Sequence, residues 1–266
     1  MKIKKLKTMK IKKKNVWAVV AALLLLSSCG ASREMARRQG EAVRRVGEAH
    51  MASMDYTSAL REFLKAEKLS WRDHQLQNDL GLVYMAKNSL EDAEESFKKA
   101  LRLKGDYSDA WNNLGSVYLA MKQWDDAIYC NERIIDDLTY ATPHYPLANL
   151  GWAYYNKKEY ATAETHYQRA LEFKPGFAMA WRDLGRTYMA MGKMSKAVNA
   201  LSRGIKAAPS RADAYFYLGH AWEGAGRPEK AVENHRRAMA LWPGSRCAED
   251  AEKQIVRIEK KMSEKK

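Results

Sequence analysis

Cysteine, proline and long apolar runs are all scarce in this sequence. Three cysteines in 266 residues cannot supply the disulfide framework of a small secreted scaffold. Six prolines beside 46% apolar residues exclude collagen-like and disordered chains and favour a fold with a sizeable core. The apolar run over residues 16–26 is too short to span a bilayer as a helix, and no other run approaches the required length.

Excess basic charge is absent from most of the chain. The formal net charge is +14, but eight lysines lie within the first 14 residues, and residues 1–28 contain no acid. Without those lysines the remainder carries a net charge of only +6. This distribution weakens a nucleic-acid interpretation, so we expect no nucleic-acid partner.

Residues 1–28 contain the parts of an export signal in order: lysines, an apolar run and small residues. The sequence Leu-Ser-Ser-Cys at 26–29 resembles the bacterial lipobox. That resemblance implies that Cys29 carries lipid, including palmitate, and becomes the mature N-terminus. The alternative is an ordinary secretory peptide that contains a cysteine. Translation begins at Met1 or at Met9, because a second basic run opens at Met9.

The residue after the predicted lipidation site bears on location. By resemblance to other lipoproteins, Gly30 favours the outer membrane over retention in the inner membrane. Two or three acyl chains anchor a protein stably, whereas one binds only marginally. We therefore expect a signal peptide over 1–28, a lipidated N-terminus and short spacer over 29–39, and a body that faces the periplasm.

The body of the chain is one repeated unit. Leu-Gly or Val-Gly pairs recur at intervals of 34, 34, 36, 34 and 34 residues. An alanine follows each of these glycines by twelve residues, and a bulky residue lies three residues after each glycine. The pattern resembles the tetratricopeptide repeat, a pair of antiparallel helices whose small residues allow close approach. The glycines are Gly47, Gly81, Gly115, Gly151, Gly185 and Gly219.

Helix pairs of this kind stack, because no single pair buries its apolar face alone. We expect an all-α fold, a right-handed superhelix of six tetratricopeptide repeats over 40–245 with a C-terminal capping helix in 246–266. Repeat 3 departs from the pattern by placing Asn131 where an aromatic residue is usual. The expected repeats are 40–73, 74–107, 108–143, 144–177, 178–211 and 212–245.

Catalytic and metal-binding patterns are missing. The six histidines are scattered over different repeats, and no pair has metal-ligand spacing on one helix. Ser96 and Lys99 form a Ser-x-x-Lys string without the partner motifs that such enzymes need. No glycine-rich phosphate loop follows a strand. We expect no enzyme, cofactor, metal or small-molecule substrate.

Recognition of another protein remains, and the first helix of each repeat should line a groove. Its face is polar and aromatic, which suits an extended peptide backbone and, through two arginines one turn apart, a carboxylate. The alternative is that these side chains are merely solvated. The predicted groove residues are Asn78, Asn112, Asn113, Ser116, Asn149, Trp152, Tyr155, Arg182, Arg186, Phe216 and His220.

The two-residue insertion between Gly115 and Gly151 predicts a protruding loop stiffened by prolines, which cannot continue the second helix of repeat 3. Tyrosines beside the prolines would offer contact area at little entropic cost. The predicted partner-binding residues of this loop are Thr139, Tyr140, Pro143, Tyr145 and Pro146.

Six repeats, a lipobox and the Thr-Pro loop leading into segment 149–155 together resemble the PilF/PilW/Tgl family of type IV pilus pilotins. The resemblance implies an outer-membrane lipoprotein that promotes assembly of the multimeric pilus secretin, and hence pilus biogenesis and twitching motility. Its partner would be a secretin subunit or another envelope protein, and its lipid would hold it to the membrane. The alternative is a periplasmic adaptor that scaffolds peptidoglycan hydrolases, synthases or proteases.

Overall fold

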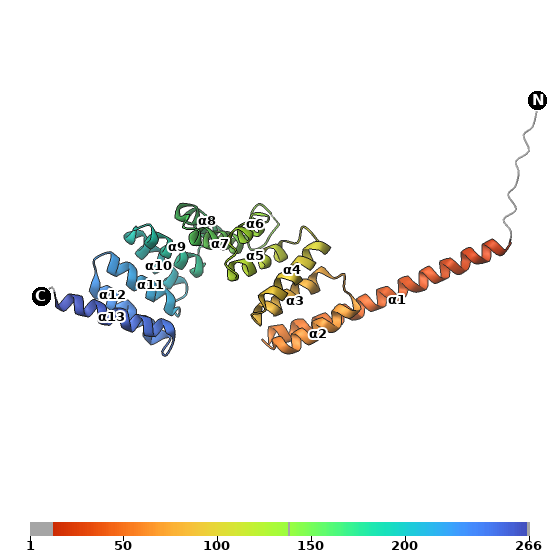
Figure 1. The fold of residues 1–266 in the computed structure, drawn as a ribbon, viewed down its shortest axis with the longest axis horizontal. Coiled ribbons are helices and arrows are strands. Elements are labelled where there is room, and N and C mark those ends of the chain that lie inside the picture. Colours follow the sequence, from red (N-terminus) through yellow and green to blue (C-terminus); the bar gives the residue numbers. More distant parts are fainter. Residues whose placement is uncertain (1–12, 138, 265–266) are drawn as a thin grey trace, which may run out of the picture. The chain divides into compact units, whose positions relative to one another are not determined.

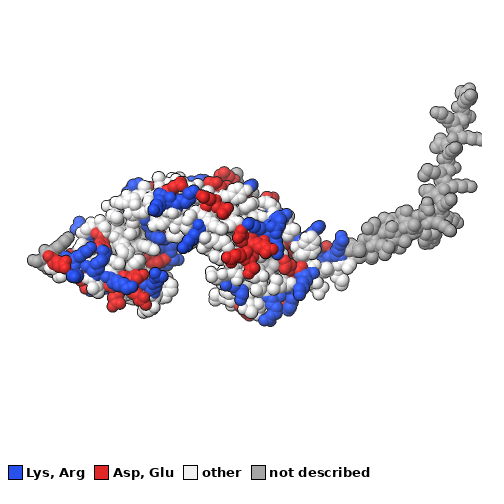
Figure 2. All heavy atoms as spheres, viewed as in Figure 1, with Lys and Arg blue, Asp and Glu red and all other residues white. Residues whose placement is uncertain are grey.

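The computed structural model describes residues 13–137 and 139–264, with side chains from residue 32 onward. Every regular element in this part of the chain is a helix, as the repeat pattern predicts (Figure 1). The helices fall into two compact units, residues 1–89 and 90–266, and the boundary lies within the span expected for repeat 2. Basic and acidic side chains are interspersed on the face drawn in Figure 2.

Unit 1 contains α1 (Lys13–Ala52), α2 (Tyr56–Leu69) and α3 (His74–Ala86). In unit 2, first helices of the repeats alternate with second helices. Its elements are α4 (Leu90–Leu103), α5 (Ser108–Ala120), α6 (Trp124–Glu132), α7 (His144–Asn156), α8 (Tyr160–Phe173), α9 (Ala178–Ala190), α10 (Met194–Ala207), α11 (Ala212–Gly224), α12 (Pro228–Leu241) and α13 (Arg246–Ser263).

Close packing within a helix pair depends on the repeated glycine. A Cβ atom on Gly47 would lie 2.4 Å from the ring of Phe63, and one on Gly151 would lie 2.8 Å from the ring of Tyr167. Both rings are fully buried, so an added methyl group would force the helices apart. The structure thus confirms the predicted reason for glycine at this place.

Repeat 3 is irregular, as its sequence predicts. Asn131 lies over Gly115 where other repeats place a ring or a leucine, and its amide donates to the carbonyl of Ala127 at 2.7 Å. Helix α6 ends at Glu132 after nine residues, whereas α8, α10 and α12 each have 14. Residues 133–143, except 138, form a described connection of turns between α6 and α7.

The turn between the two helices of each pair contains one residue in the left-handed region. Four of these residues are not glycine, and their φ angles lie between 59° and 65°. In the last two repeats the same place holds Gly192 and Gly226, both with φ of 72°. The four non-glycine residues are Met54, Asn88, Lys122 and Lys158.

The predicted C-terminal helix is α13. It begins after Ser245, whose hydroxyl accepts a hydrogen bond from the backbone N–H of Ala248 at 3.2 Å. Apolar residues at helical spacing face the preceding pair, and Ile255 and Ile258 are buried beside Val232 of α12. These contacts cover the apolar face of the last repeat.

Two predictions about the N-terminus lie outside what the structure describes. The basic run of residues 1–12 and the side chain of Cys29 are not described, so lipidation and location stay predictions. The α1 backbone is helical through residue 29 and on to Ala52. Within the described residues, no helix has a segment both long and apolar enough to cross a bilayer.

Candidate partner-binding groove

The predicted groove residues lie on the first helices of the repeats, and we call this surface of α5, α7, α9 and α11 in unit 2 the first-helix face. Most are half-buried there, among them Asn113 on α5. Asn78 lies on α3 of unit 1 and is only 5% exposed. The prediction that Asn78 lines an open groove is therefore wrong, because its side chain is packed inside unit 1.

An amide network joins α5, α6 and α7. The Asn149 side-chain nitrogen donates toward the Asn112 amide oxygen at 3.4 Å, the Ser116 hydroxyl at 3.2 Å and the Asn131 amide oxygen at 3.2 Å. The Ser116 hydroxyl itself donates to the carbonyl of Asn112 at 3.0 Å. The sequence indicated Asn131 only as a departure from the repeat pattern, yet it completes this network.

The network leaves part of each outer amide open. Among the described residues, the Asn112 side-chain nitrogen donates to no acceptor and the Asn149 side-chain oxygen accepts no hydrogen bond. One donor and one acceptor on adjacent helices can bond the C=O and N–H groups of an extended peptide. The predicted role of the asparagines is thus compatible with this geometry through these two atoms.

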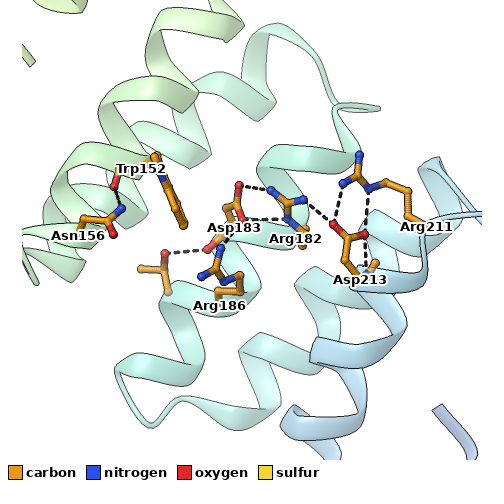
Figure 3. Close-up of polar contacts among 9 residues, drawn as sticks. Trp152, Asn156, Arg182, Asp183, Arg186, Arg211 and Asp213 are labelled. Atoms are coloured by element: carbon orange, nitrogen blue, oxygen red, sulfur yellow. Dashed lines mark hydrogen bonds and ion pairs between the residues drawn. The ribbon is translucent and has the colours of Figure 1, made fainter. Parts of the chain in front are cut away.

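The two arginines of α9 are held by carboxylates of the same unit (Figure 3). Arg182 donates to Asp183 at 2.9 and 2.8 Å and to Asp213 of α11 at 2.6 Å. Arg211 also donates to Asp213, at 3.0 and 2.6 Å. Although burial opposes the shift, these hydrogen bonds lower the pKa of Asp213 to about 2.

This pairing corrects the role expected of Arg182. The sequence predicts that it grips a carboxylate of a partner, but its guanidinium already pairs with Asp183 of α9 and, across to α11, with Asp213. The pairing with Asp213 spans 31 residues and depends on how the two helices pack, so spacing along one helix could not reveal it.

Arg186 has a different environment. One of its nitrogens lies 3.3 Å from Asp183, and its guanidinium lies 4.7 Å from the centre of the Trp152 ring and 4.8 Å from that of Tyr217. Trp152 in turn stacks on Tyr155 with 5.5 Å between ring centres. A cation between aromatic faces is attracted to both and keeps its edge available for hydrogen bonds.

A hollow of about 300 Å³ opens beside these groups on the first-helix face. It brings together residues from α7, α9 and α11, including two that sequence reasoning missed, Met179 and Tyr217. Its lining includes Asn149, Trp152, Met179, Arg182, Arg186 and Tyr217.

Phe216 and His220 lie further along the first-helix face and contact each other edge to face, with 4.6 Å between ring centres. His220 also contacts His235, a fully buried residue of α12, at 5.0 Å. Burial lowers the pKa of His235 to about 4, and the pKa of His220 is lowered for the same reason. These two predicted residues are as much part of the packing as of the surface.

The predicted loop is only partly a loop. Asp137 accepts hydrogen bonds from the N–H of Thr139 at 2.9 Å and the hydroxyl of Ser108 at 2.6 Å, which ties the connection to α5. Thr139 is exposed and Tyr140 is half-buried. Pro143 precedes α7 directly.

The last two loop residues need correction, because Tyr145 and Pro146 lie in the first turn of α7. Pro146 is buried and unavailable to a partner, and Tyr145 packs on Phe177 with 5.5 Å between ring centres. Proline is tolerated in the first turn of a helix, where backbone N–H groups lack intrahelical partners. The prolines therefore mark the start of α7, while α6 ends earlier, at Glu132.

No group of three or more histidine, cysteine or acidic side chains that could hold a metal ion occurs in the described part of the chain. The Ser-x-x-Lys string also has ordinary partners. Ser96 donates to the carbonyl of Asp92 at 2.8 Å, and Lys99 pairs with Glu95 at 3.2 Å.

Family models agree with the helix pairs and the glycine contacts. Two models described as tetratricopeptide repeat match residues 106–176 and 182–246, and one described as TPR repeat matches residues 81–122. The chain is a tetratricopeptide-repeat protein. Proteins built from these repeats present helix faces to other proteins, so the coarse function of this one is protein–protein interaction.

Solved structures of other tetratricopeptide-repeat proteins have the same fold. PilW, a widely conserved type IV pilus biogenesis factor, is 22% identical, with a TM-score of 0.74 over 79% of this chain and 97% of PilW. PilF of Pseudomonas aeruginosa is 16% identical, with a TM-score of 0.71 over 84% of this chain and 99% of PilF. YrrB, a TPR protein with an unusual peptide-binding site, is 22% identical, with a TM-score of 0.53 over 72% of this chain and 97% of YrrB.

A curated relative, superkiller complex protein 3 of Mus musculus, is 34% identical over 119 residues. That match spans 41% of this chain but only 8% of the mouse protein. It reflects shared repeats and carries no further conclusion about this tetratricopeptide-repeat protein.

Proposed function

We propose that this protein is a lipid-anchored pilotin, which binds a subunit of the type IV pilus secretin and promotes its multimerisation at the outer membrane. The observation that carries the proposal is the similarity to PilW and PilF across almost the whole of each. The lipobox-like sequence before the first repeat supports it independently, because a secretin assembly factor has to act beside the membrane that receives the channel.

The N-terminal end of unit 1 has side chains that suit a membrane surface. Trp71 is 62% exposed, and the guanidinium of Arg72 lies 4.5 Å from its ring centre. These residues share a hollow of about 490 Å³ with Arg33 and Arg37 of α1, which follow Cys29 closely in sequence. Tryptophan favours the interface of a bilayer and arginine favours anionic head groups, so we propose that this end rests on the membrane.

The first-helix face of unit 2 would hold the secretin segment. The open atoms of Asn112 and Asn149 bind its backbone, while the hollow beside Trp152, Arg186 and Tyr217 takes one apolar or acidic side chain. Arg182 contributes by fixing α9 against α11, since its charge is already compensated. The secretin side chain is therefore recognised by the shape of the hollow and by Arg186, and not by two unpaired arginines.

A charge placed in the hollow tests this assignment. Met179 lines the hollow, is 38% exposed and lies in the first turn of α9, where an acidic residue is favourable to the helix. Met179→Glu should fill the hollow and engage Arg186 without unfolding the chain. Val256→Glu on α13 is the matched control, because Val256 is 63% exposed and outside the hollow.

Both variants are expressed in cells that lack the wild-type chain and scored for heat-resistant secretin multimers. We expect Met179→Glu to lose multimers and Val256→Glu to retain them, with equal helicity by circular dichroism. Wild-type multimer levels in Met179→Glu would refute the groove assignment. Multimers that are unaffected by complete absence of the chain would refute the pilotin proposal itself.

The anchor has a separate test. Cys29→Ser removes the predicted acylation site, so metabolic labelling with a fatty acid should mark the wild-type protein and leave this variant unlabelled. A labelled variant, or an unlabelled wild type, would show that the predicted lipidation at Cys29 is wrong. Neither result would bear on the groove assignment.

A further inference from the structure

A second surface recurs in unit 2, on the second helices of the repeats. In three repeats an arginine of the second helix, or in repeat 3 the residue directly after that helix, lies over an aromatic ring from the start of the first helix. The guanidinium carbon is 5.3 Å from the ring centre for Arg133 and Trp111, 4.9 Å for Arg203 and Trp181, and 6.0 Å for Arg237 and Tyr215. Arg169 has the same place in the remaining repeat. The four arginines follow one another at 36, 34 and 34 residues.

The rings under these arginines are held in place. The indole N–H of Trp111 donates to the carbonyl of Gly105 at 2.9 Å, and that of Trp181 donates to the carbonyl of Pro175 at 2.7 Å. In each case the acceptor lies six residues earlier, in the turn before the helix. A ring fixed to the backbone holds the stacked guanidinium in one orientation, which reduces the entropy lost when a ligand binds.

An open hollow adjoins each fixed tryptophan. One, of about 380 Å³, lies between α4 and α6 over α5, and the other, of about 540 Å³, lies between α8 and α10 over α9. Their apolar linings correspond residue for residue: Leu101 and Leu171, Leu114 and Leu184, Tyr118 and Tyr188. The same hollow is thus built twice, two repeats apart.

This surface is distinct from the groove on the first-helix face. On α5, Trp111, Leu114 and Tyr118 are spaced by three and four residues and share one side of the helix. Asn112 and Ser116 lie on the other side, where they contact Asn149. We call the surface formed by the four arginines and the two hollows the second-helix face.

The arginines of the second-helix face lack internal carboxylate partners. None of the four forms an ion pair within residues 32–137 and 139–264, because no carboxylate oxygen there lies within 4.0 Å of a guanidinium nitrogen. The four are Arg133, Arg169, Arg203 and Arg237. Arg133, Arg203 and Arg237 are exposed and Arg169 is half-exposed. Their charge is therefore available to a partner, unlike that of Arg182.

The chemistry of the hollows selects among acidic partners. A polyphosphate or nucleic acid offers charge without apolar side chains, and it would meet Asp126 and Glu172, which line the two hollows. A polypeptide can place apolar side chains in the hollows and carboxylates on the arginines between them. Cations that recur from repeat to repeat, with apolar hollows beside two of them, thus suit an extended chain that carries both acidic and apolar residues.

We propose that the second-helix face of unit 2 binds an acidic polypeptide segment in which apolar residues alternate with aspartate or glutamate. The apolar side chains occupy the hollows over α5 and α9, and the carboxylates pair with Arg133, Arg169, Arg203 and Arg237. This site goes beyond the proposed function, because it would let the protein hold a second partner while the first-helix face is occupied.

The test uses the full chain and a fluorescein-labelled synthetic peptide in which Glu or Asp alternates with Leu or Phe. Fluorescence anisotropy should show saturable binding that weakens as salt is raised. The same peptide with Gln and Asn in place of the acids should bind at least tenfold more weakly, because its side chains no longer form charge-assisted hydrogen bonds. Equal affinity for both peptides would overturn the proposal.

A matched pair of variants locates the site. Arg133→Gln with Arg203→Gln removes two charges from the second-helix face, whereas Arg236→Gln with Arg246→Gln removes two exposed charges of α12 and α13. The first double variant should bind the peptide at least tenfold more weakly, and the second should bind within about twofold of the wild type.

Two results would overturn the assignment. One is equal weakening by both double variants with unchanged helicity, which would reveal an unspecific charge effect. The other is competition by inorganic polyphosphate as strong as that of unlabelled peptide, which would identify a polyanion surface instead. Neither result depends on whether the protein is a pilotin.

Discussion

The two faces of unit 2 use arginine in opposite ways. On the first-helix face, Arg182 pairs with Asp183 and Asp213, so its charge is compensated within the fold. On the second-helix face, Arg133 and Arg203 lie on tryptophan rings without a carboxylate among the described residues. The residue type alone therefore does not indicate a binding site. Arg182, which is held by two internal acids, stabilises the fold, whereas an exposed arginine with no internal acid is available for recognition.

Removing an acid should break this comparison with the largest effect. Asp183 is 6% exposed, and Asp183→Ala removes the only carboxylate that pairs with Arg186 among the described residues and one of the two that pair with Arg182 there. We expect a loss of about 3 kcal/mol in the free energy of unfolding, because uncompensated buried charges are costly. Urea unfolding followed by circular dichroism measures this loss.

The paired control lies on the second-helix face. Arg203→Ala removes an exposed side chain that stacks on Trp181, and it should change the free energy of unfolding by about 0.5 kcal/mol or less. Similar losses for Asp183→Ala and Arg203→Ala would contradict the distinction between the faces.

Acid should separate the buried carboxylate network from the buried histidine. The pKa of Asp213 is about 2, so the stability it contributes is present above its unfolded pKa and is lost only below about pH 4. His235 behaves in the opposite direction: its folded pKa of about 4 lies below the ordinary value near 6.5. The unfolded state therefore takes up the proton first as the pH falls.

From pH 7 to pH 5, the protonation of His235 in the unfolded state should reduce the free energy of unfolding by about 1–2 kcal/mol. His144, His166 and His220 have lowered pKa values and add to the effect in the same direction. His235→Phe should remove the largest part of this dependence in thermal melts at the two pH values. A dependence equal to that of the wild type would exclude His235 as its main source.

A smaller effect than that of Asp183→Ala is expected in the amide network of the first-helix face. Asn149→Ala removes the donor shared by Asn112, Ser116 and Asn131, and leaves the fully buried Asn131 oxygen without that hydrogen bond. We expect a loss of about 1 kcal/mol in urea unfolding. Asn234→Ala, which removes an exposed amide that bonds only a backbone carbonyl of its own helix, should cost less. The reverse order would mean that the network contributes little.

The fold could be predicted from the sequence because the packing of each helix pair depends on single residues at fixed positions of the repeat. At Gly47 and Gly151 an aromatic ring of the second helix packs against the first helix, which leaves no room for a side chain. The interval between such glycines therefore predicts the length of one helix pair. The left-handed turns and the short α6 also follow the repeat and its one interruption. The irregular second helix of repeat 3 was predicted from Asn131, whereas the left-handed residues of the turns were found only in the structure.

The site was predicted less well because it depends on contacts between repeats. Arg182 meets Asp213 across 31 residues, and Arg186 meets Tyr217 from the next first helix. Helical spacing placed both arginines on the correct face but could not reveal what they touch. The prolines misled for a different reason. Proline chemistry predicts that Pro146 ends the second helix of repeat 3, whereas it lies in the first turn of α7.

The left-handed residues in the inter-helix turns show where this chain could be made more robust. A side chain with a Cβ costs roughly 1 kcal/mol at such a φ angle, and Lys122 and Lys158 bear that cost where later repeats have Gly192 and Gly226. Early repeats therefore carry conformational strain that the last two avoid. Directed evolution for heat resistance should collect glycine at these two turns first, with no change to either binding face.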